Sequence, residues 1–268
     1  DARPIAAEAL ALARAVDARD IEGHALNTYG LARAALGEIE EGLEDVQAAL
    51  AIAEDLGILD DIGRAYANWY WALDLAGRLE ESVDVAMRGI ELSGRMGLMR
   101  FFGSHLLCNA ADSLFRLGRW EECERAVRRA DDIGPLGINA ILTEELFGRL
   151  ATARGQFDEA ARRLGPLASL AERAADVQFI VPVHASIAEL ALWNGRPEEA
   201  ASEAAAAIRR IEFSPETKIG EVYALGLRGN ADAAENARAR RDADAEAAAV
   251  AAGDELLDAM ERRHAEVI

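Results

Sequence analysis

The chain has 268 residues, of which 51% are hydrophobic and only 6% aromatic, and its 48 acids and 29 bases give a formal net charge of -19. Such a charge repels phosphate backbones and anionic lipid, so we expect no direct contact with nucleic acid or with a membrane surface. No run of about 18 apolar residues occurs, and the first five residues do not resemble a signal peptide, which favours a cytoplasmic protein.

A short motif recurs five times along the chain. Each copy has a glycine, any residue, a mostly apolar residue, two acids and a small residue, and the copies begin at Gly37, Gly77, Gly118, Gly155 and Gly195. The glycines are separated by 40, 41, 37 and 40 residues. A period of this length predicts an array of repeated units in which each unit packs on its neighbours.

Each unit is predicted to be an antiparallel helical hairpin with the motif at its turn. The glycine ends the first helix in the left-handed backbone conformation, and the acid pair lies in the first turn of the second helix, where the helix dipole favours negative charge. Close packing of the two helices requires the small residue five positions after each glycine. These residues are Gly42, Ser82, Cys123, Ala160 and Ala200.

In chain order, the sequence predicts a single all-α domain over residues 1–268. A lone helix over 1–19 is followed by hairpins over 21–56, 62–97, 102–133, 139–175 and 180–213 and by an atypical capping hairpin over 216–266, about 13 helices in all. Gly165 and Pro166 predict a distorted or shortened second helix in the fourth hairpin. Residues 230–268 have the alternative of a partly frayed tail. Because the chain begins inside a helix and without methionine, we expect a piece of a longer protein.

The motif closely resembles the tetratricopeptide repeat, whose usual period is about 34 residues. The longer spacing, together with the segments Asn109 to Glu122 and Ala237 to Asp242, resembles the repeat region of the large ATP-dependent LuxR-type bacterial transcriptional regulators. This resemblance covers essentially the whole chain and implies a right-handed α-solenoid that senses an inducer or a protein. In that family a nucleotide-binding switch and a helix-turn-helix flank the array. No phosphate-binding loop occurs here, since Lys218 is the only lysine.

The resemblance also implies where a ligand would bind, because the first helix of each hairpin lines the concave face of such superhelices. Aromatic rings there would provide contact area, arginines would bind a carboxylate or phosphate, and acids would bind cations, sugar hydroxyls or basic peptide side chains. The positions carried over to this groove are Arg64, Trp71, Asp74, His105, Asp112, Phe115, Arg116, Glu145, Arg149, Glu189 and Trp193.

Several of these residues have a purely structural alternative. Of Trp69, Tyr70 and Trp71, at least one ring must lie in the core, since three consecutive residues span 200° of a helix. Arg64 and Asp74 are also interpreted as a solvated face or as members of an ion pair between repeats. Other positions with structural interpretations are Asn68 and Asn109 as hydrogen-bonding residues between helices, the four histidines, the aspartates 60–61 and 131–132 as caps or turns, and Cys108 and Cys123 as reduced core thiols.

Three functions follow from this pattern. The first is an effector-sensing module with a small molecule or peptide in its groove, and the second is a scaffold that binds another protein, neighbouring domains of its own protein or a second copy. The third, an enzyme, is disfavoured because no catalytic constellation exceeds what the repeat produces by itself. We predict no catalytic residue, no metal site and no cofactor.

Overall fold

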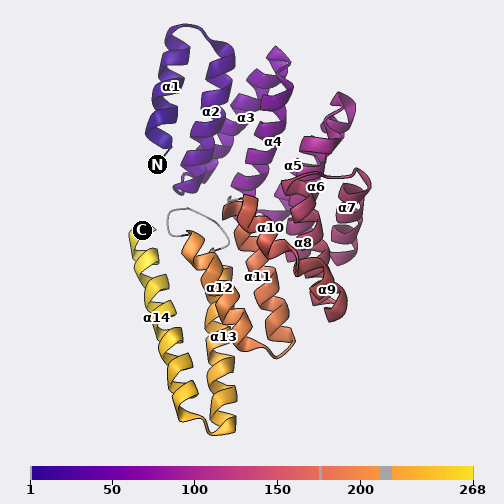
Figure 1. The fold of residues 1–268 in the computed structure, drawn as a ribbon. Coiled ribbons are helices and arrows are strands. Elements are labelled where there is room, and N and C mark those ends of the chain that lie inside the picture. Colours follow the sequence, from indigo (N-terminus) through magenta and orange to yellow (C-terminus); the bar gives the residue numbers. More distant parts are fainter. Residues whose placement is uncertain (1, 175–176, 212–218, 268) are drawn as a thin grey trace. The chain divides into compact units, whose positions relative to one another are not determined.

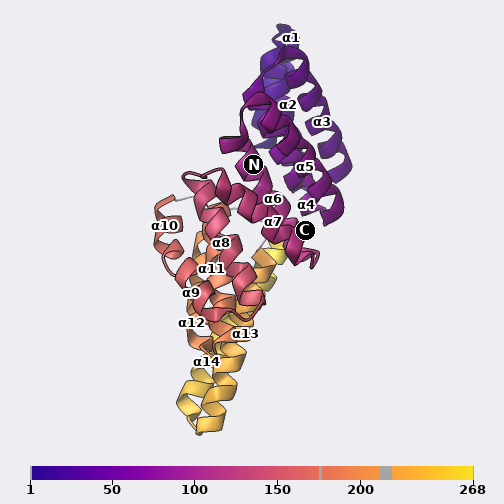
Figure 2. The ribbon, with the colours of Figure 1, turned by 90° about the vertical axis from the view of Figure 1, so that its right-hand side faces the viewer.

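The computed structural model describes residues 2–174, 177–211 and 219–267, and all the regular structure in these ranges is helical. The predicted all-α fold of successive helical hairpins is confirmed (Figures 1 and 2). Contacts divide the chain into two units, residues 1–143 and 144–268. Each unit is described by itself.

In the first unit each helix from α1 to α6 packs against the next one along the chain, and the first helices of successive hairpins also contact one another (α2 with α4, and α4 with α6). The helices are α1 (Arg3–Ala15), α2 (Arg19–Ala35), α3 (Ile39–Leu56), α4 (Leu59–Leu75), α5 (Leu79–Met96), α6 (Ser104–Arg116), α7 (Trp120–Asp132) and the beginning of α8 (Ile138–Ala153), with a π-helical turn η1 (Met99–Gly103) before α6.

The second unit continues the hairpin pattern with one interruption. After the rest of α8 come α9 (Phe157–Leu164), α10 (Leu167–Ala174), α11 (Val177–Trp193), α12 (Pro197–Ile211), α13 (Ile219–Arg240) and α14 (Ala243–Val267). Gly165 and Pro166 separate α9 from α10, as predicted for this hairpin. The helices α12, α13 and α14 lie side by side (Figure 1). Of the predicted hairpins, residues 175, 212, 213 and 216–218 lie outside the described ranges.

All five motif glycines adopt the predicted left-handed conformation, with φ between +67° and +91°. The same turn also joins α1 to α2, α3 to α4, and α5 to the π-helical turn before α6, which the motif did not predict. At Gly77 the amide nitrogen donates to Asp74 and the next amide to Leu73, and at Gly57 the corresponding donors reach Glu54 and Ala53. The positions that share this turn in the first unit are Asp17, Gly37, Gly57, Gly77, Gly97 and Gly118. The structural turn therefore recurs about every 20 residues, half the sequence period.

Two of these turns place a residue other than glycine in the left-handed region, Asp17 (φ 56°) and Arg241 (φ 59°). A Cβ atom in this conformation costs roughly 1–2 kcal/mol. We therefore expect Asp17→Gly and Arg241→Gly each to raise the free energy of unfolding by about 1 kcal/mol, and Gly77→Ala to lower it by a similar amount. Nothing lies within 4 Å of a Cβ built at Gly77, so the effect of Gly77→Ala comes from the backbone conformation and not from a steric clash. Urea denaturation followed by circular dichroism measures all three, and a stabilising Gly77→Ala would contradict this explanation.

An arginine directly after the turn glycine binds the second acid of the motif. Arg78 donates two hydrogen bonds to Glu81, at 2.7 and 2.6 Å, and Arg119 binds Glu122 in the same way. These hydrogen bonds lower the pKa of both carboxyls below its ordinary value, so the acids stay ionised at the positive end of the helix. Arg196 contacts Glu199 at the corresponding place.

The predicted small residues do lie where the two helices of a hairpin meet. Ser82, Cys123, Ala160 and Ala200 are fully buried, and Gly42 is buried as well. A Cβ at Gly42 would come within 2.6 Å of the carbonyl oxygen of Gly30, so α2 and α3 approach backbone to backbone. In the second hairpin the small residue is polar, and the buried hydroxyl of Ser82 lies 2.8 Å from that of Ser113 on α6, the first helix of the next hairpin.

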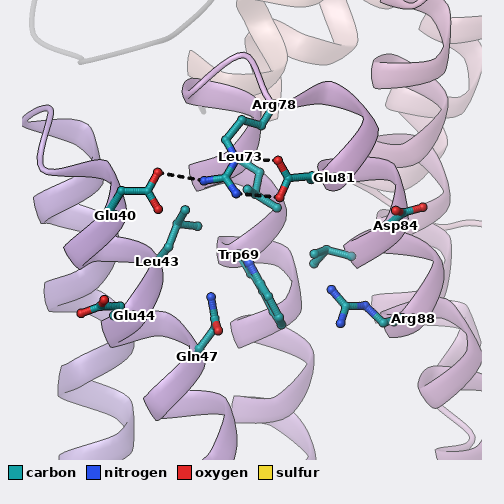
Figure 3. A pocket seen from close by; sticks show the side chains of 11 residues that line it. Glu40, Leu43, Glu44, Gln47, Trp69, Leu73, Arg78, Glu81, Asp84 and Arg88 are labelled. Carbon is teal, nitrogen blue, oxygen red and sulfur yellow. Dashed lines mark hydrogen bonds and ion pairs between the residues drawn. The ribbon is translucent and has the colours of Figure 1, made fainter.

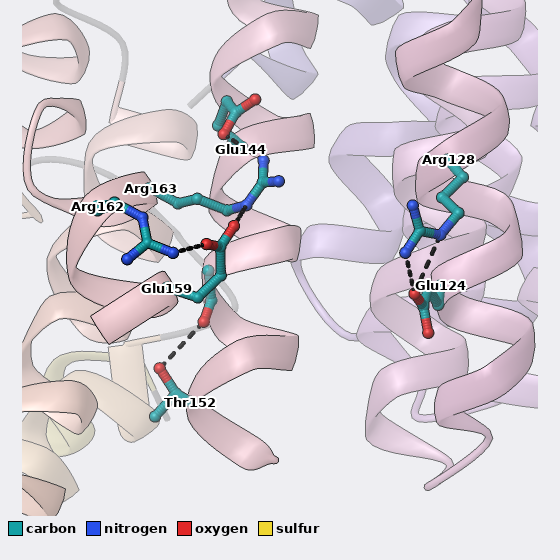
Figure 4. A network of polar contacts seen from close by, with 8 residues as sticks. Glu124, Arg128, Glu144, Thr152, Glu159, Arg162 and Arg163 are labelled. Carbon is teal, nitrogen blue, oxygen red and sulfur yellow. Dashed lines mark hydrogen bonds and ion pairs between the residues drawn. The ribbon is translucent and has the colours of Figure 1, made fainter. Parts of the chain in front are cut away.

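In the second unit, α9 is fixed to α8 by charge and by packing. The guanidinium of Arg163 donates to Glu144 of α8 at 2.8 Å and to Glu159 of its own helix at 2.6 Å (Figure 4). It also lies 4.4 Å from the ring centre of Phe147. Beneath it, Leu164 of α9 covers Gly148 of α8, where a Cβ would meet the leucine side chain at 2.5 Å.

Candidate functional site

The residues predicted to line a groove on α4 and α6 bind mainly to neighbouring first helices. Arg116 of α6 forms an ion pair with Asp74 of α4, and Asp112 lies 3.8 Å from the same guanidinium. Both acids are buried. Of the alternatives for Asp74, the structure shows the ion pair between repeats. Its partner, Arg116, is another predicted groove residue.

The other end of this face is also joined by polar contacts. Arg64 of α4 reaches back to α2, where it donates to the carbonyl oxygen of His24 at 3.2 Å and to the hydroxyl of Thr28 at 3.4 Å. One turn further on, the Asn68 side chain donates to Asn27 at 2.9 Å, which confirms the interpretation of Asn68 as a residue that joins two helices. These contacts fix the spacing of α2 and α4.

The predicted residues of α6 have structural neighbours as well. The His105 ring lies 3.3 Å from the Asn139 side chain, and burial lowers the pKa of this histidine below its ordinary value. Phe115 stacks on Trp120, with ring centres 6.1 Å apart. Trp71 is half-buried and packs beside Tyr70 in the core. The cysteines at 108 and 123 are buried and form no disulfide within the described ranges, as predicted.

In the second unit the four remaining predicted residues differ in exposure. Glu145 is buried and accepts a hydrogen bond from Ser186 of α11. Arg149 is buried, and its guanidinium lies 3.7 Å from Glu221 of α13. Glu189 is half-buried, whereas Trp193 is 55% exposed, with the guanidinium of Arg228 5.8 Å from the centre of its ring.

A pocket of about 230 Å³ lies in the first unit between the two second helices α3 and α5, with α4 behind it (Figure 3). Carboxylates and arginines form its walls, and apolar side chains form its floor. Its lining residues are Glu40, Leu43, Glu44, Gln47, Trp69, Leu73, Arg78, Glu81, Asp84, Val85 and Arg88. None of these is among the residues predicted for the groove.

Arg78 connects the two walls of the pocket. It binds Glu81 on α5 through two hydrogen bonds and donates a third to Glu40 on α3, at 2.9 Å (Figure 3). Three of its nitrogens thus have carboxylate acceptors, so this guanidinium is occupied within the chain. The contact with Glu40 also joins one repeat to the next.

Trp69 forms the aromatic part of the floor. The guanidinium of Arg88, on α5, lies 4.8 Å from the centre of this ring, within the range of a cation–π contact. Trp69 also stacks on Tyr66, with ring centres 6.3 Å apart. The indole therefore lies between a half-buried aromatic neighbour on its own helix and an exposed arginine from α5.

The pocket has the chemistry of a binding site. In the described ranges no group of three or more histidines, cysteines, aspartates or glutamates could hold a metal ion. None of the helices in those ranges is long and apolar enough to cross a bilayer. Carboxylates beside an aromatic floor can hold a cation or a basic side chain.

Sequence reasoning missed this pocket although two of its signals are visible in the chain. The position seven residues after the turn glycine is acidic in the first two copies, as Glu44 and Asp84, but basic in the next two, as Arg125 and Arg162. The second signal is Trp69, one of three consecutive aromatic residues of which at least one must lie in the core. The copies diverge on the second helices as well as on the first.

Comparison with known proteins supports the fold and does not assign a family. No family model matches the chain, and no curated protein matches it. Among solved structures, BtubC (BKLC) from P. vanneervenii is similar with a TM-score of 0.62 and 15% identity, over 77% of this chain and 88% of that one. A Rap protein complexed with competence and sporulation factor is similar with a TM-score of 0.60 and 13% identity, over 93% of this chain and 66% of that one. These likenesses confirm a helical-repeat fold of the tetratricopeptide type.

Proposed function

We propose that this chain is an interaction module that binds a peptide, or an exposed segment of a partner protein, at the pocket between α3 and α5. The observation that carries the proposal is the pocket itself, in which apolar side chains of α3, α4 and α5 form a floor between the polar side chains of α3 and α5. The similar Rap protein is complexed with a factor, and this likeness of fold supports a binding role.

The size of the pocket favours a peptide side chain over a whole small molecule. Sites for drug-sized ligands enclose about 300–1,000 Å³. At about 230 Å³ this pocket is smaller and holds one large side chain. A partner segment would therefore place a single residue in the pocket and lie across α3 and α5 with the rest of its chain.

The proposal includes the kind of protein to which this interaction module belongs. The segments Asn109 to Glu122 and Ala237 to Asp242 support a sensor region of a LuxR-type transcriptional regulator, located in the cytoplasm and binding rather than transforming its effector. The groove of first helices remains the predicted site for such an effector. Its exposed Trp193 supports a contact in the second unit.

Selection of random peptides displayed on phage, with the full chain as bait, tests the binding role. Peptides enriched on the unchanged chain are then measured against Gln47→Trp, which fills the pocket, and against Ala48→Trp on the same exposed stretch of α3 outside the pocket. We expect Gln47→Trp to weaken binding by about tenfold or more and Ala48→Trp to leave it unchanged. Circular dichroism checks that both variants fold.

Two outcomes would contradict the proposal. Failure to enrich any peptide would remove the binding role. Peptides that bind both variants equally well would locate binding on another surface, such as the predicted groove.

A further inference from the structure

Resting on the proposed function, we infer that the side chain taken up by the pocket is an arginine of the partner segment. The guanidinium would lie against the aromatic floor, and the carboxylates of the two walls would attract it. This assigns a partner chemistry, a basic peptide, to a site on the second helices of the array.

The charges that line the pocket favour a cation. Four carboxylates face two guanidiniums there, and one of these, Arg78, is held by Glu40 and Glu81. Glutamate is ionised at neutral pH at its ordinary pKa, and the hydrogen bonds from Arg78 lower the pKa of Glu81 further. An anionic side chain would meet a wall of the same sign, in a chain whose net charge is -19.

Two of the wall carboxylates are available for a partner. Asp84 and Arg88 are four residues apart on α5, a spacing at which an acid and a base commonly pair. Arg88 instead lies over Trp69, and within the described ranges no hydrogen bond or ion pair joins Asp84 to another side chain, although its charge helps to raise the pKa of Arg119. In the same ranges no hydrogen bond or ion pair joins Glu44, on the opposite wall, to another side chain. Both acids are exposed, so a partner can reach them.

The floor favours arginine over lysine. A guanidinium is planar, is weakly hydrated and stacks on indole while its edge keeps donating hydrogen bonds, whereas an ammonium is a compact and strongly hydrated charge. The position of Arg88, 4.8 Å from the centre of the Trp69 ring, shows that this ring accepts a guanidinium. Because Arg88 is exposed and long, an incoming arginine can replace it there.

Titration of the full ¹⁵N-labelled chain with short peptides tests the inference. The probes are three acetylated and amidated pentapeptides, Gly-Ser-X-Ser-Gly, in which X is arginine, lysine or the neutral isostere citrulline. The readout is the indole signal of Trp69, assigned with Trp69→Phe. We expect arginine to shift this signal, lysine to bind several-fold more weakly and citrulline to have no effect.

Two double variants with the same net charge show whether arginine binds in the pocket. Glu44→Gln with Asp84→Asn should weaken arginine binding by about tenfold or more, because two charge-assisted contacts are lost. The matched control, Glu41→Gln with Glu91→Gln, removes two exposed acids from the same helices outside the pocket and should leave binding unchanged. Arg88→Ala should strengthen binding.

Three results would overturn the inference. They are equal shifts with citrulline and arginine, equal loss in the two double variants, or no shift of the Trp69 signal with any probe. The selection of phage-displayed peptides tests the proposed binding role independently of this titration. Selected peptides that are sensitive to Gln47→Trp but contain no arginine would retain the binding role and remove this partner chemistry.

Discussion

Leu164→Ala is expected to lower the free energy of unfolding by about 2–5 kcal/mol, the usual cost of truncating a fully buried leucine. The Leu164 side chain is 1% exposed and lies directly over Gly148, on the facing helix α8. Gly148→Ala alone should also destabilise, by about 1–3 kcal/mol, because its methyl group would come within 2.5 Å of Leu164.

A double variant with both substitutions shows whether the loss of stability comes from the contact between Leu164 and Gly148. The three atoms nearest to a Cβ at Gly148 all belong to Leu164, so the alanine methyl group has room once that leucine is shortened. We expect the double variant to be more stable than the sum of the two single losses by about 1–2 kcal/mol. Urea denaturation of the four proteins gives this coupling, and strict additivity would contradict the packing described for α8 and α9.

Gly42→Ala is expected to cost about 1–3 kcal/mol or more, and no second substitution should relieve it. The new methyl group would lie 2.6 Å from the carbonyl oxygen of Gly30 and 2.9 Å from the backbone nitrogen of Ala34. Because both neighbours are backbone atoms, α2 and α3 would have to move apart. Thermal denaturation followed by circular dichroism measures the loss.

A helical glycine with open space around it is the control for this experiment. Gly94 is exposed on α5, and the nearest atom to a Cβ there is the sulfur of Met99 at 3.8 Å. Gly94→Ala should stabilise the chain by about 0.5–1 kcal/mol, since alanine loses less backbone entropy than glycine. If both substitutions had the same sign, close contact of α2 and α3 would not explain the small residue in the motif.

The hairpins could be predicted from the sequence because the motif marks a backbone requirement. A left-handed turn followed by ionised acids needs glycine and glutamate at fixed places, so Gly77 and Glu81 reveal it directly. The equivalent turns between hairpins carry only part of the motif, since Gly57 is followed by two acids but then by Ile62 in place of a small residue, and Gly97 is followed by no acid pair. At Asp17 and Arg241 even the glycine is missing.

The site was harder to predict, since it depends on which side of a helix its neighbours leave open. Counting from the turn glycines places Asp74 and Arg116 on the first helices, but it does not show that the two side chains bind each other. The pocket requires Trp69 to face the space between α3 and α5, a relation among three helices. The spacing of residues along the sequence does not show how far apart three helices lie.

The packing of each helix on its near neighbours also governs how the chain folds. Most helix pairs in contact in the described ranges are adjacent in sequence or separated by a single helix, and Arg149 of α8, which lies near Glu221 of α13, is an exception. Ordering such contacts closes only short loops, which predicts a low contact order and rapid folding for a protein of this length. Hydrogen exchange should therefore show damage at Gly42 confined to amides of nearby helices, because in an array of this kind stability is a sum of neighbouring terms.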